Sequence, residues 1–396
     1  MLLGIQSDPM KFLLLCALVG EAAAAVNRSS TQCYEHPRIK YGLKWQAQGH
    51  GFFDLFHFIE TDSNNGATHY VPHYEAKRLG IVEEHSNHAI MRAGPRSPSK
   101  RMKRTSAKIF SKSYWNYFLV TMRFTHVPFG CGVWPAFWTH APRSVWPNGG
   151  ELDILEWAND FPGQVSFHTG ERNKCRLHHQ AMNPPGCTPM PDTNGMNYDC
   201  DTHYPSKLGC APNRLPIHPG NHWANQPGVV AAEWTPEFVK VFYIPEAELE
   251  KAGLEGAGAP QPDDWDQYIM SYLPFKKSED LESGTCPNPD KVLWPQQLVF
   301  QTSFCGDWAG KTWGNSGSCV NVVGPTMDRC DAVDPLAPDT KPESFEHDCC
   351  SMYVYDENQE FKSDEHFHWT AYWNFTYIKV WQWEGWHGNS NLRGPK

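Results

Sequence analysis

The chain has no excess of positive charge and no long apolar run. Its 396 residues include 34 Lys and Arg against 44 Asp and Glu, a net charge of −10. Proteins that bind nucleic acid gain affinity by neutralising phosphates with Lys and Arg, so this balance argues against a nucleic-acid partner. Helical periodicity is weak and internal repeats are absent, which excludes a helical array or a coiled coil.

Aromatic residues, glycine and proline are abundant instead. The chain contains 17 Trp, and aromatic residues make up 13% of it. Exposed Trp faces suit ligands that offer a flat apolar C–H surface, and sugar rings are one such ligand. The 31 Gly and 32 Pro indicate many turns, as in an all-β protein. Hydrophobic residues at 40% suffice for a packed core, which excludes wholesale disorder.

The N-terminal residues have the pattern of a secretory signal peptide. Met10 and Lys11 precede an apolar run over residues 12–20, and small residues follow at 22–25 in an Ala-x-Ala pattern. The run is shorter than the roughly 20 residues that span a bilayer as a helix. We therefore predict a signal peptide over residues 1–25 and a secreted protein; the alternative is a buried N-terminal helix.

Two further features bear on secretion. Asn27 and Asn374 each begin an Asn-x-Ser/Thr glycosylation motif. Asn374 lies in an expected strand, so we expect Asn27 to be the freely accessible one. Residues 386–396 are expected to form a loose tail without an apolar segment, which indicates neither a lipid-anchor signal nor a membrane span.

Cysteine usage points to disulfides. Thirteen cysteines less Cys16 in the apolar run leave twelve, an even number that suits an oxidising compartment. Four of them crowd a stretch rich in Pro, Asn and Gly, namely Cys175, Cys187, Cys200 and Cys210. Zinc is the alternative, but no pair there has the Cys-x-x-Cys spacing of a closed site. Cys349 and Cys350 are expected to bond to two different partners, because a vicinal bridge strains the backbone.

Strand patterns dominate the rest of the chain. Short runs of β-branched and aromatic residues predict strands at residues 118–124, 165–169, 229–234, 238–244, 298–304 and 371–383. Residues 247–252 predict a turn or two of helix at most. The basic run at 100–104 is expected to be a solvated loop rather than a binding patch. We therefore predict one all-β domain over residues 26–385, in which one large β-sandwich spans roughly residues 33–385.

The densest chemical signal is Gly-Gly-Glu-Leu-Asp-Ile-Leu-Glu at residues 149–156. Polar and apolar residues alternate at its start, so Glu151 and Asp153 point to the same face of a strand. In a regular strand Glu156 would face the opposite side. One extra residue at Leu155, a β-bulge, would turn it back to join the other two carboxylates.

Three carboxylates on one face suit glycoside hydrolysis. Like charges close together raise at least one pKa, which keeps a general acid protonated near neutrality. A retaining glycosidase needs two carboxyls about 5–5.5 Å apart, one as nucleophile and one as general acid and then base. Neighbouring side chains on one strand face can present that separation. The alternative is an acidic edge strand, since the short pattern alone is common.

Several motifs surround these carboxylates. They are Trp-Pro-Ala-Phe-Trp at 134–138, Trp-Pro-Asn-Gly-Gly-Glu-Leu-Asp-Ile-Leu-Glu at 146–156, Phe-His-Thr at 167–169, Ala-Glu-Trp at 232–234, Phe-Cys-Gly-Asp-Trp-Ala-Gly at 304–310 and Ala-Tyr-Trp at 371–373. Together they resemble glycoside hydrolase family 16, in particular its fungal-type, laminarinase-like endo-β-1,3(4)-glucanases. The resemblance covers most of the secreted chain. It implies a β-jelly-roll sandwich of two curved antiparallel sheets, a glycan-binding cleft on the concave side, and retention through a covalent glycosyl-enzyme.

The resemblance also implies roles for individual residues. Glu151 matches the nucleophile, Glu156 the acid/base, and Asp153 the residue that tunes their charge. His168 matches a histidine on the neighbouring strand, close to the carboxyls; a histidine satisfied in the core is the alternative. The aromatic positions that match the lining of the cleft are Trp134, Trp138, Trp146 and Trp308, each of which could instead belong to the core.

Two features depart from the family pattern. Trp157 follows the last glutamate, where the fungal-type enzymes typically have a small residue, and we expect it to reshape the subsites past the cleavage point. Residues 175–218 are rich in Cys, His and Pro and do not align closely with the family. The linkage preference therefore stays open.

The sequence predicts a secreted, endo-acting hydrolase of β-1,3 or mixed β-1,3/1,4 glucan, monomeric and without cofactor or catalytic metal. A transglycosylase would share every catalytic residue and differ only in how a sugar acceptor and water compete. A glucan-binding module without activity is the third reading, although such relatives typically lack the catalytic glutamates. Residues 314–318 fail the serine-hydrolase elbow, and His85 and His88 lack the Glu of His-Glu-x-x-His.

Overall fold

The computed structural model describes residues 39–170, 175–177, 187, 190, 199–202, 208–214, 220–224, 226–256, 258–275, 286, 292–316, 318–319, 322 and 348–384. The predicted signal peptide, Asn27 and the predicted C-terminal tail lie outside these residues. Within them, none of the helices is long and apolar enough to cross a membrane.

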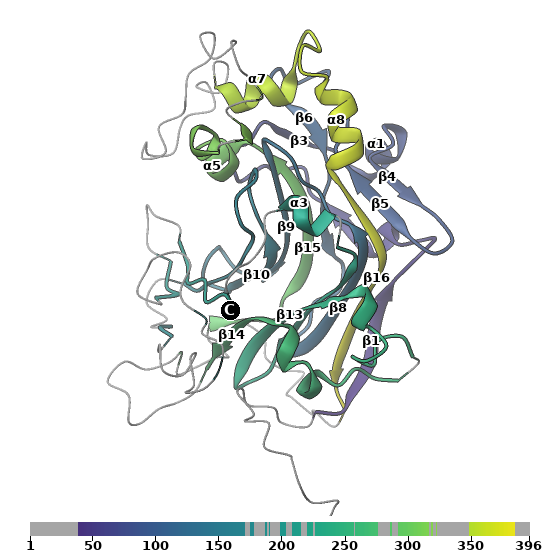
Figure 1. Ribbon diagram of the computed structural model, residues 1–396, viewed down its shortest axis with the longest axis vertical. Helices are drawn as coiled ribbons and strands as arrows, with labels where there is room; N and C mark the ends of the chain where they lie inside the picture. The colour runs from purple at the N-terminus through teal and green to yellow at the C-terminus, as the bar shows by residue number, and fades with distance from the viewer. Residues whose placement is uncertain are drawn as a thin grey trace, which may run out of the picture. The chain divides into compact units, whose positions relative to one another are not determined.

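Two antiparallel sheets form the domain (Figure 1). The larger sheet contains, in spatial order, β14 (Ile269–Pro274), β13 (Phe238–Pro245), β12 (Gly228–Trp234), β8 (Phe118–His126), β16 (Tyr372–Trp383), β5 (Ala89–Arg92) and β4 (Val82–Glu84), with β1 (Tyr41–Ala47) also paired to β16. The smaller sheet contains β11 (Gln164–His168), β10 (Glu151–Glu156), β9 (Val133–His140), β15 (Gln297–Phe304), β7 (Lys108–Ser111) and β2 (Phe56–Phe58). A separate parallel pair joins β3 (Thr68–Tyr70) and β6 (Arg104–Ser106).

The β12–β13 hairpin shows how the local sequence sets the pairing. The two strands pair without interruption from Gly228 opposite Pro245 to Trp234 opposite Val239. In the turn, the Thr235 hydroxyl accepts the backbone N–H of Phe238 at 3.1 Å, a local bond typical of Ser and Thr in turns. This hairpin and the other strands predicted from the sequence are confirmed, each to within one residue at either end except β8, which continues two residues further to His126.

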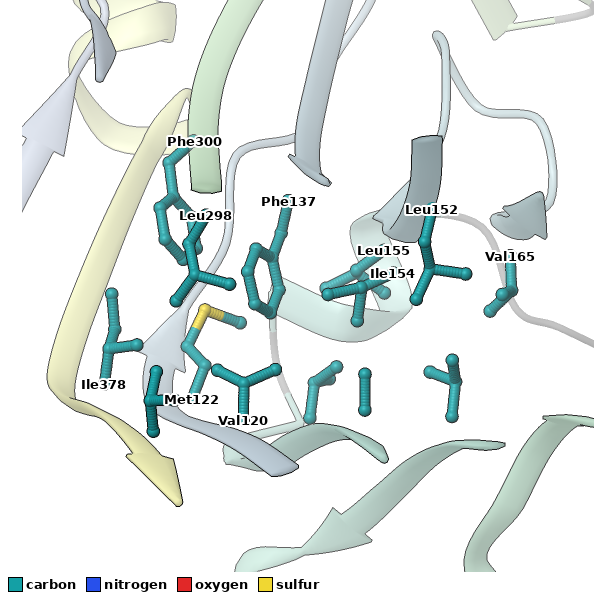
Figure 2. Close-up of a cluster of buried hydrophobic side chains, with 14 of the residues drawn as sticks. Val120, Met122, Phe137, Leu152, Ile154, Leu155, Val165, Leu298, Phe300 and Ile378 are labelled. Atoms are coloured by element: carbon teal, nitrogen blue, oxygen red, sulfur yellow. The ribbon is translucent and has the colours of Figure 1, made fainter. Parts of the chain in front are cut away.

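The core lies between the two sheets. Side chains alternate between the faces of each strand, and on the inner face of the smaller sheet Phe137 stacks on Phe300 with ring centroids 4.3 Å apart. Val120 and Met122 of β8 face them from the larger sheet (Figure 2). Burial of apolar surface, at roughly 25 cal/mol per Å², stabilises this contact. The predicted sandwich of two antiparallel sheets is confirmed.

The helices are short. They are α1 (His73–Arg78), α3 (Gly220–Ala224), α5 (Gly306–Ala309), α7 (Cys349–Tyr355) and α8 (Ser363–Thr370), with 3-10 turns η1 (Phe53–Leu55), η2 (Glu246–Glu248), η3 (Pro262–Asp264), η4 (Asp266–Tyr268) and η5 (Trp313–Asn315). The turn predicted near residue 247 is present as η2, whereas α7 and α8 were not predicted. The Asp348 carboxylate caps α7 by accepting the N–H of Cys350 at 2.9 Å. The Cys305–Cys350 disulfide also fixes this helix, so it forms without an apolar periodicity.

The basic run at residues 100–104 is only partly the solvated loop that its charge predicts. Lys100 and Arg101 are exposed, but Arg104 begins β6 and is buried. Its guanidinium donates to the Gly94 carbonyl at 2.9 Å and to the Asp364 carboxylate at 2.7 Å. The prediction was wrong for Arg104 because α8 supplies the carboxylate, and that packing is invisible in the local sequence.

Disulfides replace the alternative of a zinc site. The bridges are Cys131–Cys319, Cys175–Cys286, Cys200–Cys210 and Cys305–Cys350, and Cys187 and Cys349 are oxidised as well. The vicinal cysteines are thus not bonded to each other, as predicted. This many disulfides fits an oxidising, extracellular compartment. Asn374 lies in β16 and is half-buried, as its strand placement predicted.

Candidate active site

A β-bulge in β10 brings the three carboxylates to one face. The register with β11 shifts between Asp153 and Glu156, and the register with β9 shifts between Asp153 and Leu155. Leu155 therefore joins Ile154 in the core, and Glu156 turns to the side of Glu151 and Asp153. The bulge predicted from the spacing is confirmed.

The approach of Gly150 to a neighbouring segment fixes where β10 begins. Gly150 has φ +70°, a conformation that favours glycine. A Cβ at this position would lie 2.1 Å from the Val292 carbonyl oxygen. The Gly-Gly pair before Glu151 thus lets the chain pass close to the residues that precede β15, and the first carboxylate follows at once.

Asp153 is the most tightly held of the three carboxylates. It is buried, and its Oδ2 accepts the Ser166 hydroxyl at 2.6 Å. His168 Nε2 lies 3.3 Å from the same oxygen. Ser166 and His168 are two residues apart on β11, so their side chains lie on the same face of the sheet, the face that carries Asp153. Thr202 faces the other ring nitrogen, since its hydroxyl lies 3.4 Å from His168 Nδ1.

Glu156 is bound by an indole. Trp134 Nε1 donates to Glu156 Oε1 at 2.7 Å, and Trp308 of α5 packs edge-on against Trp134 with ring centroids 5.7 Å apart. Both tryptophans are half-buried. Trp134 is thus a hydrogen-bond partner of the proposed acid/base as well as an aromatic surface beside it.

Glu151 is the first residue of β10, and Asp153 lies between it and Glu156 along the strand. The side chain of Trp146 hydrogen-bonds to it, and the Trp146 ring lies 6.0 Å from the His168 ring. An oxygen of Glu151, an oxygen of Asp153 and a ring nitrogen of His168 lie within 4.8 Å of one another, a spacing that would also accept a metal ion.

Burial and mutual repulsion shift the two glutamates in the same direction. Burial first, then the charges of Asp153 and Glu156, raise the pKa of Glu151 well above its usual value. Burial first and the charge of Asp153 second raise the pKa of Glu156 as well. The Trp134 N–H and the Gln164 side chain oppose that rise in the pKa of Glu156, because they stabilise the charged form. The cluster of Glu151, Asp153 and Glu156 therefore retains a proton at a pH where free carboxyls have lost theirs.

Glu156→Gln is expected to stabilise the protein at neutral pH. Because the folded-state pKa is raised, the folded form binds this proton more tightly than the unfolded form, and stability falls as pH rises from about 4.3 through the folded-state value. Glutamine keeps an acceptor for Trp134 and removes that penalty. We expect a higher Tm than wild type at pH 8, by roughly 2–4 °C for each kcal/mol released, and a smaller difference at pH 4. The exposed control Glu250→Gln should show the same Tm difference from wild type at both pH values. The same pH-independent difference in Glu156→Gln would contradict the raised pKa of Glu156.

A row of side chains crosses the smaller sheet on the face that carries the carboxylates. Asp153 pairs with Trp138, Trp138 with Val299, Val299 with Phe110, and Phe110 with His57. We call these five residues the cross-strand row. Trp138 and Phe110 touch edge-on at 5.8 Å between ring centroids. The predicted aromatic position Trp138 thus lies directly beside the carboxylates, on a line that leads across five strands to β2.

Every predicted site residue lies in this one region, but the sequence reasoning missed several that support it. Ser166 shares the strand face of His168, and that alternation was a usable signal. Asn159 is buried; its Oδ1 accepts the N–H of Gly132, and its Nδ2 donates to the Ala309 carbonyl at the end of α5. Asn159 thereby positions the helix that carries Trp308, a link that only the fold creates.

The expectation for Trp157 was wrong. Its side chain is fully buried in the core cluster, on the opposite side of the strand from Glu156. Gly220 of α3 packs against its indole, since a Cβ there would lie 2.0 Å from Trp157 Nε1. The bulge explains the error: it returns Glu156 to the carboxylate face, and the next residue then points inward.

Comparison with known proteins identifies the family. Residues 55–337 match the family described as XgeA-like, catalytic GH16 domain. The chain belongs to glycoside hydrolase family 16. It is 30% identical over 303 residues to a probable glycosidase of Schizosaccharomyces pombe, covering 73% of this chain and 66% of that one. It is 27% identical over 361 residues to the endo-1,3(4)-β-glucanase xgeA of Emericella nidulans, covering 88% of this chain and 48% of that one.

Solved structures of family 16 share the fold. Laminarinase 16A from Phanerochaete chrysosporium, in complex with β-glucans, superposes with a TM-score of 0.62 at 24% identity, covering 86% of this chain and 99% of that one. An elongating family 16 β-1,3-glucosyltransferase superposes with a TM-score of 0.60 at 26% identity, covering 87% of this chain and 100% of that one. Against the curated sequences the chain spans only about half to two thirds of their length, from 48% to 66% in the two named above.

Proposed function

We propose that this family 16 protein is an endo-acting, retaining β-glucanase that cleaves β-1,3 or mixed β-1,3/1,4 glucan. The observation that carries the proposal is the bulged strand β10, which gathers Glu151, Asp153 and Glu156 on one face. The relatives named as endo-1,3(4)-β-glucanases and the family's laminarinase structures support the substrate class.

In the first step, we assign Glu151 as nucleophile and Glu156 as general acid. Glu156 gives its proton to the glycosidic oxygen, and the Glu151 carboxylate attacks the anomeric carbon, so that the C–O bond to the leaving sugar breaks and a glycosyl ester forms. The raised pKa of Glu156 keeps the proton available for this step. The negative charge that then remains on the Glu156 carboxylate is stabilised by Trp134, whose indole N–H already donates to this group.

In the second step, Glu156 acts as base. It takes a proton from water, the resulting hydroxide equivalent attacks the anomeric carbon, and Glu151 leaves as a carboxylate. Asp153 remains between the two glutamates along the strand, held by Ser166 at 2.6 Å. In this assignment it sets how the group shares its protons, since its charge contributes to the raised pKa of both glutamates.

The remaining parts of the proposal concern the substrate and the location. The half-buried rings of Trp134, Trp138, Trp146 and Trp308, together with His168, surround the carboxylates and are proposed to contact the sugar rings. The disulfides and the predicted signal peptide at residues 1–25 support secretion of a catalytic domain over residues 26–385. A monomer is proposed.

Product analysis on laminarin, lichenan and cellulose tests the function. We expect short oligosaccharides from laminarin or lichenan and none from cellulose, and no product from the Glu151→Ala protein. Absence of product from all three glucans, with binding retained, would make the protein a glucan-recognition module and refute the hydrolase assignment.

Glucan transfer is the second candidate, favoured by the similarity to the elongating β-1,3-glucosyltransferase at 26% identity. A transferase passes the glycosyl ester to a sugar hydroxyl instead of water, with the same carboxyls. The same product analysis separates the two: incubation with laminari-oligosaccharides yields longer products if transfer dominates and only shorter ones if hydrolysis does.

Trp134→Phe is expected to move the alkaline limb of the kcat/KM profile to higher pH. The indole N–H stabilises the charged form of Glu156 and so opposes the rise in its pKa. Phenylalanine keeps an aromatic ring but no donor, so the pKa of Glu156 rises further and the limb moves in the same direction. The limb is measured from pH–rate profiles on laminarin. Trp138→Phe serves as the control, because the indole N–H of Trp138 has no hydrogen-bond partner among the described residues. If the alkaline limb of kcat/KM has the same pH midpoint in both variants, the assignment of Glu156 as acid is contradicted.

A further inference from the structure

A disulfide joins two stretches of chain along the outer edge of β11, the last strand of the smaller sheet at this end. Phe167 exchanges both backbone hydrogen bonds with Cys210, at 2.8 and 3.0 Å. The N–H of Thr169 donates to the Cys200 carbonyl at 2.9 Å. Cys200 and Cys210 are bonded to each other. One disulfide thus connects the backbone partners of the residues immediately before and after His168.

We call Cys200, Asp201, Thr202, Gly209 and Cys210 the edge segment. Side-chain and backbone hydrogen bonds tie its first half to Thr169. Asp201 is buried, and its Oδ1 accepts the Thr169 hydroxyl at 2.6 Å. The N–H of Thr202 donates to the Thr169 carbonyl at 3.0 Å. The backbone that carries the Thr202 side chain is therefore fixed against the end of β11.

The edge segment encloses one side of the His168 ring. The Thr202 hydroxyl lies 3.4 Å from His168 Nδ1, and Thr202 is fully buried. Gly209 approaches the same nitrogen, since a Cβ at this position would lie 2.9 Å from Nδ1 and 2.1 Å from the Phe167 carbonyl oxygen. Only a residue without a Cβ allows so close an approach. Both halves of the edge segment thus meet at this one ring nitrogen.

The other ring nitrogen of His168 meets the carboxylate cluster. His168 Nε2 lies 3.3 Å from Asp153 Oδ2 and 3.4 Å from the Ser166 hydroxyl. An ionised carboxylate only accepts hydrogen bonds, so Nε2 carries the proton that faces Asp153. In the neutral ring Nδ1 is then the acceptor, and the Thr202 hydroxyl donates to it. A chain of contacts therefore runs from Thr202 through His168 to Asp153.

We propose that Thr202 is a positioning residue for the reaction: it holds the His168 ring so that Nε2 donates to Asp153. The Cys200–Cys210 disulfide keeps Thr202 within reach of the ring. This role rests on the proposed function, because it acts on the carboxylates that break the glycosidic bond.

The effect on the reaction follows from the proton that the carboxylates share. A donor to Asp153 stabilises the charged form of this carboxyl, which leaves the proton on a glutamate. Without that donor Asp153 holds the proton more of the time, and Glu156 is less often available as the acid. Turnover therefore falls, whereas the aromatic surfaces beside the carboxylates stay in place and substrate binding is retained.

The first test measures kcat and KM on laminarin for two substitutions of Thr202. Thr202→Val keeps the size of the side chain but removes the hydroxyl. We expect kcat to fall by about three- to tenfold, the usual effect of one lost hydrogen bond, with KM unchanged. Thr202→Ser keeps the hydroxyl and is expected to retain most of kcat.

Thr105→Val is the matched control. Thr105 is a buried threonine of β6, outside the smaller sheet, and its hydroxyl donates to the Pro95 carbonyl at 2.7 Å. Its loss should leave kcat and KM at wild-type values. A wild-type kcat in Thr202→Val, or an equal fall in kcat in Thr202→Val and Thr202→Ser, overturns the proposal.

The role of the disulfide is tested by combining variants. Cys200→Ser/Cys210→Ser separates the two halves of the edge segment and should lower kcat by a similar factor. In that protein Thr202→Val should add little, because the hydroxyl is already out of place. Losses that multiply in full would show that the disulfide does not act through Thr202. If the cysteine variant does not fold, the Thr202 variants, which keep the disulfide, decide the proposal.

The ring nitrogens of His168 give a readout that does not depend on turnover. Their ¹⁵N chemical shifts report whether Nδ1 accepts a hydrogen bond, and the signals are assigned by their loss in His168→Gln. We expect the Nδ1 shift to change in Thr202→Val and to match wild type in Thr202→Ser and Thr105→Val. An unchanged Nδ1 shift in Thr202→Val overturns the contact whether or not the protein is active. A changed shift in a protein that cleaves no glucan would support the contact and refute the proposed function alone.

Discussion

Glu151→Ala is expected to lower kcat on laminarin by roughly 10⁴-fold or more, the size of loss that follows removal of a covalent nucleophile. No glycosyl ester can form without this carboxylate. Glu156, Asp153 and the surrounding rings remain, so the protein should still bind laminarin with nearly unchanged affinity. The measurements are kcat from reducing-sugar release and affinity from electrophoresis in a laminarin gel.

Glu250→Ala is the control for this variant, because Glu250 is an exposed carboxylate outside the site. It should leave both turnover and binding at wild-type values. Retained turnover in Glu151→Ala would remove Glu151 as nucleophile and return that role to another carboxylate of β10. Loss of binding together with turnover would instead indicate that Glu151 holds the site in shape.

Glu156→Ala is expected to lower kcat on laminarin by roughly 10²–10⁴-fold, the usual contribution of a general acid. With an aryl glycoside, whose leaving group needs no proton, the glycosyl ester still forms but is released slowly because the base is missing. Azide needs no base, so adding it should restore turnover and yield a glycosyl azide of the same anomeric configuration as the substrate. Product configuration is read by NMR.

The same azide experiment on Glu151→Ala is the discriminating control. There azide would replace the missing nucleophile directly and give the inverted configuration. If azide fails to rescue Glu156→Ala on the activated substrate, the acid/base role belongs elsewhere. If the rescued product is inverted, the assignments of Glu151 and Glu156 must be exchanged.

Much of this site follows from patterns that are local in the sequence. Alternation along residues 149–156 places Glu151 and Asp153 on one face, and the odd spacing to Glu156 demands the bulge that β10 contains. The strands of the sandwich were predicted to within a few residues for the same reason, since side-chain alternation and turn residues act over short distances. Their order in the two sheets was not predicted.

What depends on distant partners could not be predicted. Arg104 was expected in solvent, yet Asp364, 260 positions away, binds it in the interior. Trp157 was expected near the cleft, but the bulge turns it inward onto α3. The sequences of helices α7 and α8 have no strong apolar periodicity, so these helices were not predicted. Distant contacts hold them instead: the Cys305–Cys350 disulfide holds α7, and the buried Arg104 binds Asp364 of α8.

By itself the sequence determined the fold class, the family and the three carboxylates, because strand alternation and contiguous motifs are properties of neighbouring residues. Only the tertiary structure decided how those carboxylates are tuned. The indole of Trp134 on Glu156, the hydroxyl of Ser166 on Asp153 and the row that ends at His57 arise where strands pair across the sheet. Burial and electrostatic interaction act through space, so the raised pKa values appear only after the sheet has assembled.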